Sequence, residues 1–266
     1  MRPLILDISF YQDNPDTKSI IVDFDKMKES GVSGVIFRVG QATWEDKKFG
    51  EYWKNSEDKG LLRGAYWYYD NSESPENQAE LCVSILKKYK AKLDMPLYAD
   101  FEDRRDKLPF MGWEKWYRFI ERIKLLAPEI KVGVYSGYYY YMEYCPKTQP
   151  QRDYFGKMPF WIAQYPYESH VAEELYTQPK IPTNTWSDWA FWQVSDRGDG
   201  HFHGVESSRV DINYFNGTLK ELYAKYGKPE EIIPSPEVPE PEIPEKESRS
   251  LTIDYGDKKV SYKEKV

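Results

Sequence analysis

The chain has 266 residues, 17% of them aromatic, and a formal net charge of −7. This length suits one large α/β domain with a tail, or two small domains. The acidic balance argues against nucleic acid as a partner, because phosphate binding needs an excess of Lys and Arg on one face. No stretch approaches the roughly 20 apolar residues of a membrane-spanning helix, so membrane insertion is not expected.

Strand-like and helix-like segments alternate over residues 1–226. Helices are expected at about 22–29, 76–89, 112–125 and 218–226, and Ser74-Pro75 is a plausible N-cap and first-turn proline for the second. Short, mostly apolar strands alternate with the helices and predict an α/β barrel of parallel strands, irregular over 165–187 where no helical periodicity is evident. The eight expected strands are 4–8, 34–39, 64–69, 96–102, 132–135, 160–163, 189–194 and 209–212.

The composition changes abruptly after Gly227. Alternating Pro and Glu residues predict a semi-rigid, extended linker over 227–250. Residues 251–266 alternate apolar and polar positions around a Gly-Asp turn, which predicts a hairpin. Because an isolated hairpin is only marginally stable in water, a docking strand pair and the start of a truncated module both stay open.

Two carboxylates end the apolar segment Pro96–Glu102. Asp100 and Glu102 are spaced i and i+2, so in a strand their side chains point the same way. Like charges held together and partly desolvated do not both ionise easily, so one pKa rises and that carboxyl can carry a proton near neutrality. A proton donor beside a carboxylate is what cleavage of a glycosidic bond needs.

Other candidate side chains follow the remaining strands. In parallel barrels the chemistry lies at the carboxyl ends of the strands, and the first and eighth strands are neighbours, so Asp7 and Asp211 should join Asp100 and Glu102. A lone Asp at a strand end is more often a cap or turn former, and Asp-x-Glu also occurs in metal sites, but four acids together favour a functional cluster. Residues at corresponding positions, mostly rings that offer a sugar an apolar face and a polar tip, are Arg38, Tyr66, Tyr68, Tyr135, Trp161 and Trp192.

Neither a metal nor a disulfide framework is expected. His201 and His203 lie in a Gly-rich loop with no obvious third ligand, so we predict no metal site and no cofactor. Cys82 and Cys145 are the only cysteines, and two buried free thiols are the favoured reading.

Five motifs in order resemble glycoside hydrolase family 25, the Chalaropsis-type lysozymes common among phage endolysins and bacterial autolysins. The resemblance covers about residues 3–222 and implies a flattened, irregular (β/α)8-like (TIM-type) barrel. It also implies cleavage of the β-1,4 bond between N-acetylmuramic acid and N-acetylglucosamine, with Glu102 as proton donor and Asp100 as its partner. Asp7 and Asp211 would complete the acidic floor, and Gln164 becomes a further substrate-binding candidate. The motifs are Leu6–Gln12, Tyr98–Glu102, Trp161–Tyr165, Trp192–Ser195 and Val210–Phe215.

Two departures from the family pattern bear on specificity. Many members carry His after the Gly-x-Tyr of the third strand, where this chain has Trp67, and this affects which glycans or stem peptides fit. No recognisable wall-binding repeats follow the linker, which puts tight anchoring to a particular bacterial surface in doubt.

The leading hypothesis is a metal-independent, monomeric peptidoglycan muramidase. A non-catalytic wall-binding module and a hydrolase of another N-acetylated glycan such as chitin stay open, as does retention against inversion. The apolar run at the N-terminus is too short for a signal peptide. A phage endolysin would therefore be expected in the host cytoplasm and then at the wall, and a bacterial homologue outside the cell by another route.

Overall fold

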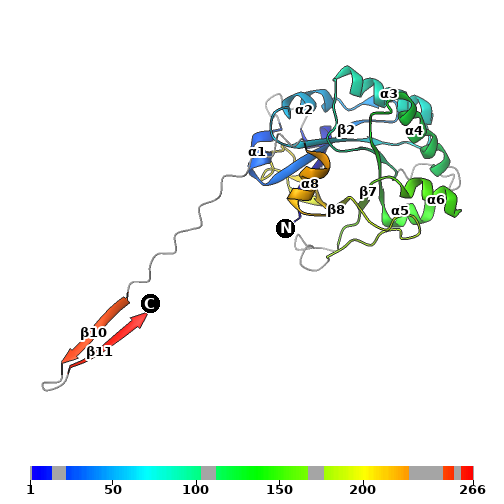
Figure 1. Ribbon diagram of the computed structural model, residues 1–266. Helices are drawn as coiled ribbons and strands as arrows, with labels where there is room; N and C mark the ends of the chain where they lie inside the picture. The colour runs from blue at the N-terminus through cyan, green and yellow to red at the C-terminus, as the bar shows by residue number, and fades with distance from the viewer. Residues whose placement is uncertain are drawn as a thin grey trace. The chain divides into compact units, whose positions relative to one another are not determined.

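The computed structural model describes residues 2–13, 22–102, 112–166, 177–227, 248–254 and 259–265 (Figure 1). The chain divides into two compact units between Glu231 and Ile232. Most of the expected linker, residues 228–247, lies outside the described residues. In the second unit, β10 (Ser248–Asp254) pairs antiparallel with β11 (Lys259–Lys265).

Strands form the wall of the first unit and helices surround them (Figure 1). The strands are β1 (Leu4–Ile8), β2 (Val32–Gln41), β3 (Trp44–Glu45), β4 (Leu62–Tyr68), β5 (Leu97–Asp100), β6 (Val132–Gly137), β7 (Phe160–Ala163), β8 (Phe191–Asp199) and β9 (Arg209–Phe215). The helices are the 3-10 turn η1 (Phe10–Gln12), α1 (Phe24–Glu29), α2 (Phe49–Asn55), α3 (Pro75–Lys88), α4 (Gly112–Leu126), α5 (Tyr138–Tyr144), α6 (Gln149–Gly156) and α8 (Leu219–Tyr226).

The sheet closes into a barrel, as expected. Its order is β1-β9-β8-β7-β6-β5-β4-β2, the β1–β2 pairing completes the ring, and β3 adds to β2 as a short antiparallel strand. The expectation that all strands run parallel is wrong for β9, which is antiparallel to both β8 and β1. A parallel crossover needs a dozen or more residues, usually a helix, whereas the chain turns back between Asp199 and Arg209. A Cβ on Gly200 would collide with the Ser207 carbonyl oxygen, so this turn requires glycine there.

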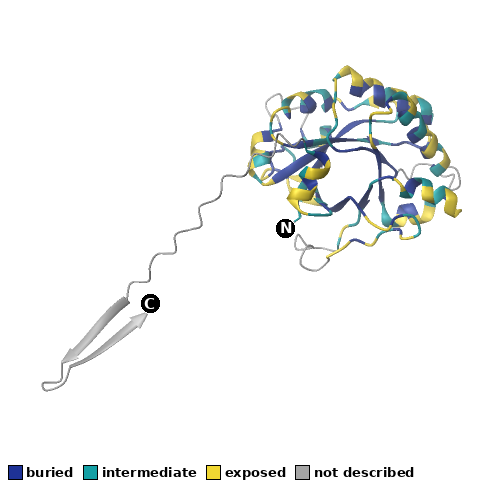
Figure 2. Cartoon of the chain, in the orientation of Figure 1, coloured by how far each residue is buried: buried dark blue, intermediate teal, exposed yellow. Residues whose placement is uncertain are grey.

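The core has two parts because side chains alternate between the faces of each strand. An outer part lies between strands and helices, and an inner part fills the barrel with residues such as Ile36, Tyr98 and Trp161. Figure 2 shows the strands almost wholly buried, with exposed residues on the outer helix faces. Because β9 runs backwards, α8 begins at the amino-terminal end of the other strands. There its Leu222 and Tyr226 join the inner core.

Local sequence signals account for the helices that flank β5. Ser74 caps α3 as predicted, accepting a hydrogen bond from the Asn77 backbone N–H at 3.3 Å. The helix expected at 112–125 is α4. Arg118 on α4 pairs with Glu76 on α3 at 2.9 Å, which ties the two helices together across their exposed faces.

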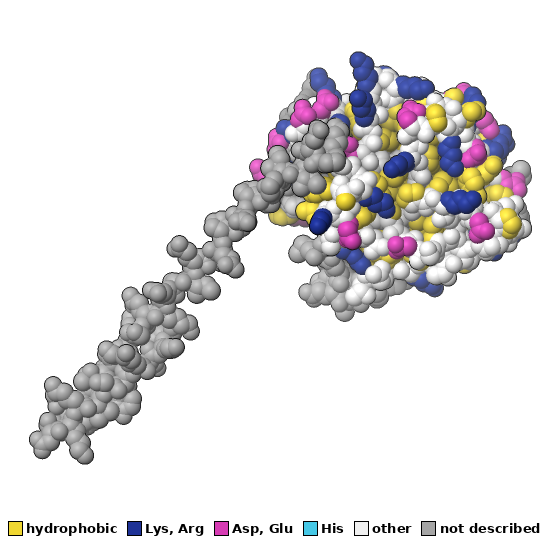
Figure 3. Space-filling view, viewed as in Figure 1, with side chains coloured by type: hydrophobic (Ala, Val, Ile, Leu, Met, Phe, Trp, Pro, Cys, Tyr) yellow, Lys and Arg dark blue, Asp and Glu magenta, His cyan; other side chains and the backbone are white. Residues whose placement is uncertain are grey.

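Two further expectations concern the cysteines and the surface. Cys82 and Cys145 are free and buried, as expected. On the face shown in Figure 3, Lys and Arg alternate with Asp and Glu among apolar side chains, so the net negative charge is not gathered there. Among the described residues, every helix is too short or too polar to cross a membrane.

Candidate active site

A cavity of about 190 Å³ opens where the parallel strands end. Side chains from β1, β2, β4, β5, β6, β7, β8 and β9 reach it, so every strand of the closed ring contributes. Its lining residues are Asp7, Ser9, Tyr11, Gln12, Arg38, Tyr66, Tyr68, Asp100, Glu102, Tyr135, Trp161, Gln193 and Asp211. The structure thus brings all four predicted acids to one cavity.

The first acid pair comes from β5. Asp100 is the last residue of that strand and Glu102 follows two positions later, and both line the cavity as their spacing predicted. Asp100 is only 2% exposed, whereas Glu102 is partly exposed. Glu102 therefore stands nearer the opening, and Asp100 lies deeper, with Tyr68 and Tyr135 as its register partners on β4 and β6.

The second acid pair joins two strands. Asp7 on β1 and Asp211 on β9 are directly opposite in the antiparallel ladder, where like charges destabilise each other. The pKa of Asp211 is raised to about 9, mainly because the carboxyl is buried and secondly because of the charge of Asp7. Burial also raises the pKa of Asp7, although hydrogen bonds from Asn213 and Gln193 oppose that rise. Near neutral pH Asp211 therefore keeps its proton, and this relieves the repulsion between the two facing acids.

Two amides hold this second pair in place. Gln193 Nε2 donates to Asp7 Oδ2 at 2.9 Å and Asn213 Nδ2 donates to the same oxygen at 2.8 Å. Each amide oxygen accepts in turn: that of Gln193 from the Tyr135 hydroxyl at 2.9 Å, and that of Asn213 from Trp161 Nε1 at 2.7 Å. The result is a buried network that fixes Asp7 as its central acceptor.

Sequence reasoning missed both amides although the signal was present. Asn213 is two residues beyond Asp211 on the same strand, so it shares the inward face. Gln193 lies in one of the five family motifs, but the sequence favours its aromatic neighbour Trp192 as the sugar contact. Ser9, Tyr11 and Gln12 were also missed, and they reach the cavity from the turn η1 that directly follows β1.

All the predicted site residues except Gln164 and Trp192 line the cavity. Because Gln193 takes the inward position on β8, Trp192 points outward, is 1% exposed, and donates its Nε1 hydrogen to the Gln164 carbonyl oxygen at 2.7 Å. The Gln164 side chain instead accepts from the backbone N–H of Lys180. Asp211 reaches the rim because β9 is antiparallel, so its amino-terminal half, not its carboxyl end, lies there.

Phenol groups surround the carboxylates. Burial raises the pKa of Tyr66 well above its ordinary value, and the charges of Asp7, Asp100 and Asp211 add to this although Arg38 opposes it. Burial and the charge of Glu102 do the same for the pKa of Tyr135. Both hydroxyls therefore stay protonated and can donate hydrogen bonds.

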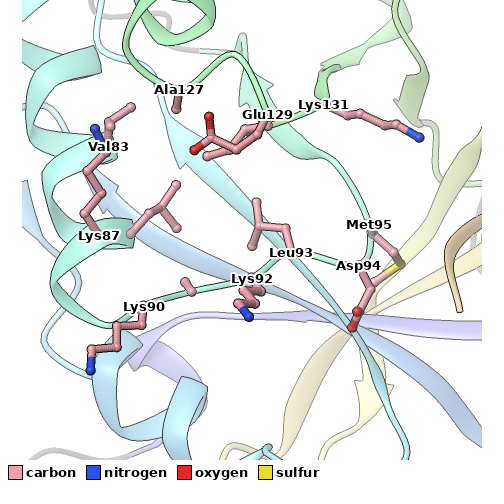
Figure 4. Close-up of a pocket in the computed structure, with 13 residues that line it drawn as sticks. Val83, Lys87, Lys90, Lys92, Leu93, Asp94, Met95, Ala127, Glu129 and Lys131 are labelled. Atoms are coloured by element: carbon pink, nitrogen blue, oxygen red, sulfur yellow. The ribbon is translucent and has the colours of Figure 1, made fainter. Parts of the chain in front are cut away.

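A larger cavity, of about 610 Å³, lies at the other end of the barrel, where β5 and β6 begin (Figure 4). Aliphatic side chains form much of its lining, and Lys87, Lys90, Lys92 and Lys131 contribute four cationic groups. Among the residues that the structure describes, its lining has no aromatic ring, and Asp94 and Glu129 are its only acids. This chemistry does not resemble that of the acid cavity.

The histidine pair, His201 and His203, lies in the turn between β8 and β9. His203 Nδ1 lies 2.8 Å from the Ser30 hydroxyl, which gives this side chain a structural partner between the β8–β9 turn and α1. In the described part of the chain, no three His, Cys, Asp or Glu residues are arranged to hold a metal ion.

Comparison with known sequences covers most of the chain. The sequence matches the family described as glycosyl hydrolases family 25 over residues 6–204. It is also 31% identical over 227 residues to the uncharacterized protein YegX of Escherichia coli strain K12, spanning 82% of this chain and 71% of that protein.

Solved structures share the fold. The bacterial lysozyme of Streptomyces coelicolor is similar with a TM-score of 0.65 at 22% identity, over 85% of this chain and 98% of that one. The catalytic domain of endolysin ply40 from bacteriophage P40 of Listeria monocytogenes is similar with a TM-score of 0.63 at 24% identity, over 86% and 98%. The expected irregular α/β barrel is therefore an architecture that this chain has in common with these proteins.

Proposed function

The chain belongs to glycosyl hydrolases family 25 and is a glycoside hydrolase of the lysozyme type, and on this basis we propose which bond it cleaves and which residues take part in the cleavage. The bond is the β-1,4 linkage between N-acetylmuramic acid and N-acetylglucosamine in bacterial peptidoglycan. The observation that carries the proposal is the gathering of Asp7, Asp100, Glu102 and Asp211 in one aromatic-lined cavity.

Glu102 serves as the general acid. It is the more exposed member of the β5 pair and has the longer side chain, so it can reach the bridging oxygen of a bound glycan. Its carboxyl proton passes to that oxygen as the bond to the anomeric carbon breaks. Water then adds to the anomeric carbon and returns a proton to the Glu102 carboxylate, which restores the starting state.

The other acids supply negative charge where positive charge develops. Asp100, deeper in the cavity, lies close to the anomeric carbon or to the N-acetyl group that assists it. The Asp7–Asp211 pair lies in the same cavity, and Gln193 and Asn213 fix the position of Asp7. Charges held in place before the reaction stabilise an oxocarbenium-like transition state without reorganisation.

The cavity is small beside the roughly 300–1,000 Å³ of typical ligand pockets. About 190 Å³ encloses the reacting part of a substrate and leaves the remainder outside. That size suits a polymer cleaved within its length.

Mass spectrometry of the products tests the proposal. Purified peptidoglycan and chitin are each incubated with the enzyme, and the expected products from peptidoglycan end in reducing N-acetylmuramic acid. Products ending in reducing N-acetylglucosamine would refute the bond assignment. Faster cleavage of chitin than of peptidoglycan would indicate that the substrate is another N-acetylated glycan. Binding to peptidoglycan without new reducing ends would mean a wall-binding role.

A further inference from the structure

Arg38 is a buried cation held rigidly at the edge of the acid cavity. It lies on β2 beside Tyr66 of β4 and is 5% exposed. Its Nε donates to Asp46 Oδ2 at 2.8 Å. Its guanidinium carbon lies 5.0 to 5.2 Å from the ring centres of Phe10, Trp44 and Tyr11. Charge pairing and stacking together fix the plane of the guanidinium group.

One donor of this group is left over. Arg38 Nη2 is buried and has no hydrogen-bond partner among the described residues. Buried polar groups nearly always have a partner, and a guanidinium cannot lose its proton to escape the cost. The described residues leave this place open, and a bound substrate is one group that can take it.

The other residues that line the cavity limit the charge and polarity that a partner of Arg38 can have. Arg38 is the only Lys, Arg or His side chain among the described lining residues, whereas four carboxylates face the same space. An anionic or carbonyl group of a substrate would be repelled by the acids and finds its favourable contact at Arg38. This end of the cavity also reaches the surface, because the lining residue Tyr11 is 68% exposed.

Resting on the proposed function, we propose that Arg38 recognises the lactyl group on O3 of N-acetylmuramic acid. Its partner is the lactyl carboxylate when no stem peptide is attached, and the lactyl carbonyl oxygen when one is. N-Acetylglucosamine lacks this group, so Arg38 is the residue by which the enzyme selects peptidoglycan over chitin. The exposed ring of Tyr11 marks where an attached stem peptide leaves the cavity.

The test changes both the protein and the substrate. Glycan strands are stripped of stem peptides with an amidase, which leaves free lactyl carboxylates, and half of the sample has those carboxylates reduced to alcohols. Wild-type enzyme should cleave the reduced strands with kcat/KM at least about tenfold lower, mainly through KM, because one charge-assisted hydrogen bond is lost. In Arg38→Met, kcat/KM on the unreduced strands should exceed kcat/KM on the reduced strands by less than about threefold.

Arg38→Lys is the conservative variant and should fold, because Asp46 keeps a cationic partner. It still removes the second arm of the guanidinium group. It too should lose most of the preference. Arg63→Met is the matched control, since Arg63 on β4 also stacks on a ring, with its guanidinium carbon 4.3 Å from Trp53, but lies outside the cavity lining. It should discriminate between the strands as the wild type does.

Each outcome bears on a different claim. A wild type without preference, or Arg38 variants that keep it, would overturn the role of Arg38, and so would equal losses on both strands. Cleavage of intact peptidoglycan but of neither stripped strand would overturn it as well. No new reducing ends from intact peptidoglycan would instead refute the proposed function itself.

Discussion

The two acid pairs share one cavity but are built in different ways. Asp100 ends β5, Glu102 comes two residues later, and the two side chains differ in exposure. Asp7 and Asp211 come from strands about 200 residues apart in sequence and face each other in register, and Asp211 keeps its proton near neutral pH. The first pair is placed to meet substrate, whereas the second is enclosed by amides that hold Asp7 in position. Carboxylates of the same type thus take different tasks according to their surroundings.

The largest loss is expected for Glu102→Gln. Glutamine keeps the size of the side chain but has no proton to give to the leaving oxygen, so kcat should fall about 10²–10⁴-fold. Release of reducing ends from purified cell walls measures it. Glu114→Gln on the exposed side of α4 is the matched control and should be fully active. Wild-type-like clearing of cell walls by Glu102→Gln would mean that the proton comes from elsewhere.

Asp100→Asn should come next. The substitution removes a charge next to the reacting carbon but leaves the acid of Glu102 intact, so kcat should fall about 10²–10³-fold with KM little changed. Steady-state kinetics on soluble glycan strands separates the two constants. A change in KM alone would assign Asp100 to substrate binding. Its charge would then have no role in the chemical step.

Asp7→Asn should affect stability as well as rate. Asp7 Oδ2 accepts from both Gln193 and Asn213, and Asp7 also has a side-chain hydrogen bond with Asp211. Asparagine has a single acceptor oxygen and cannot accept from all three groups. An unsatisfied buried donor costs about 1–3 kcal/mol in unfolding free energy. Urea denaturation at pH 7 measures this loss. An unchanged midpoint would show that the amide network does not depend on the charge of Asp7.

Asp211→Asn should be milder at neutral pH and should change the pH dependence of stability. The pKa of Asp211 is raised to about 9 from an ordinary 3.8, so between these values the folded chain holds a proton that the unfolded chain has released. Stability from this group is complete below the lower value and is lost as pH rises through the upper one. The slope is at most about 1.4 kcal/mol per pH unit.

Denaturation of the wild type and of Asp211→Asn at pH 5 and pH 8 isolates this contribution. Asparagine does not titrate, so the variant should gain on the wild type as pH rises. Asp153→Asn, an exposed position on α6, controls for removing an acidic group at the surface. A constant difference between wild type and Asp211→Asn across this range would contradict a proton held on Asp211.

The sequence was most informative where the signal is local. The i, i+2 spacing of Asp100 and Glu102 and the capping by Ser74 need only a few neighbouring residues, and the structure has both. Helix α5 was not predicted, since it begins after Gly137 without a side-chain cap and consists mainly of tyrosines. The sequence did not predict the direction of β9, because that direction depends on pairing with β1, which lies far away in the sequence.

The smallest effect on activity is expected for Trp192→Phe, and it tests where the site ends. Trp192 and Gln193 are neighbours on β8 but point to opposite faces, one into the outer core and the other into the amide network. Phenylalanine loses the hydrogen bond to the Gln164 carbonyl oxygen, so unfolding free energy should fall by about 1–3 kcal/mol. Because no contact in the cavity changes, kcat and KM should stay within about twofold.

Gln193→Leu is the companion variant for this position. It removes a donor to Asp7 and an acceptor for Tyr135, so kcat should fall together with stability. Measuring kcat, KM and the unfolding midpoint for both variants therefore separates the two faces of one strand. If Trp192→Phe raised KM more than Gln193→Leu did, substrate would have to reach the outer face of β8, and the site would extend beyond the cavity that holds the acids.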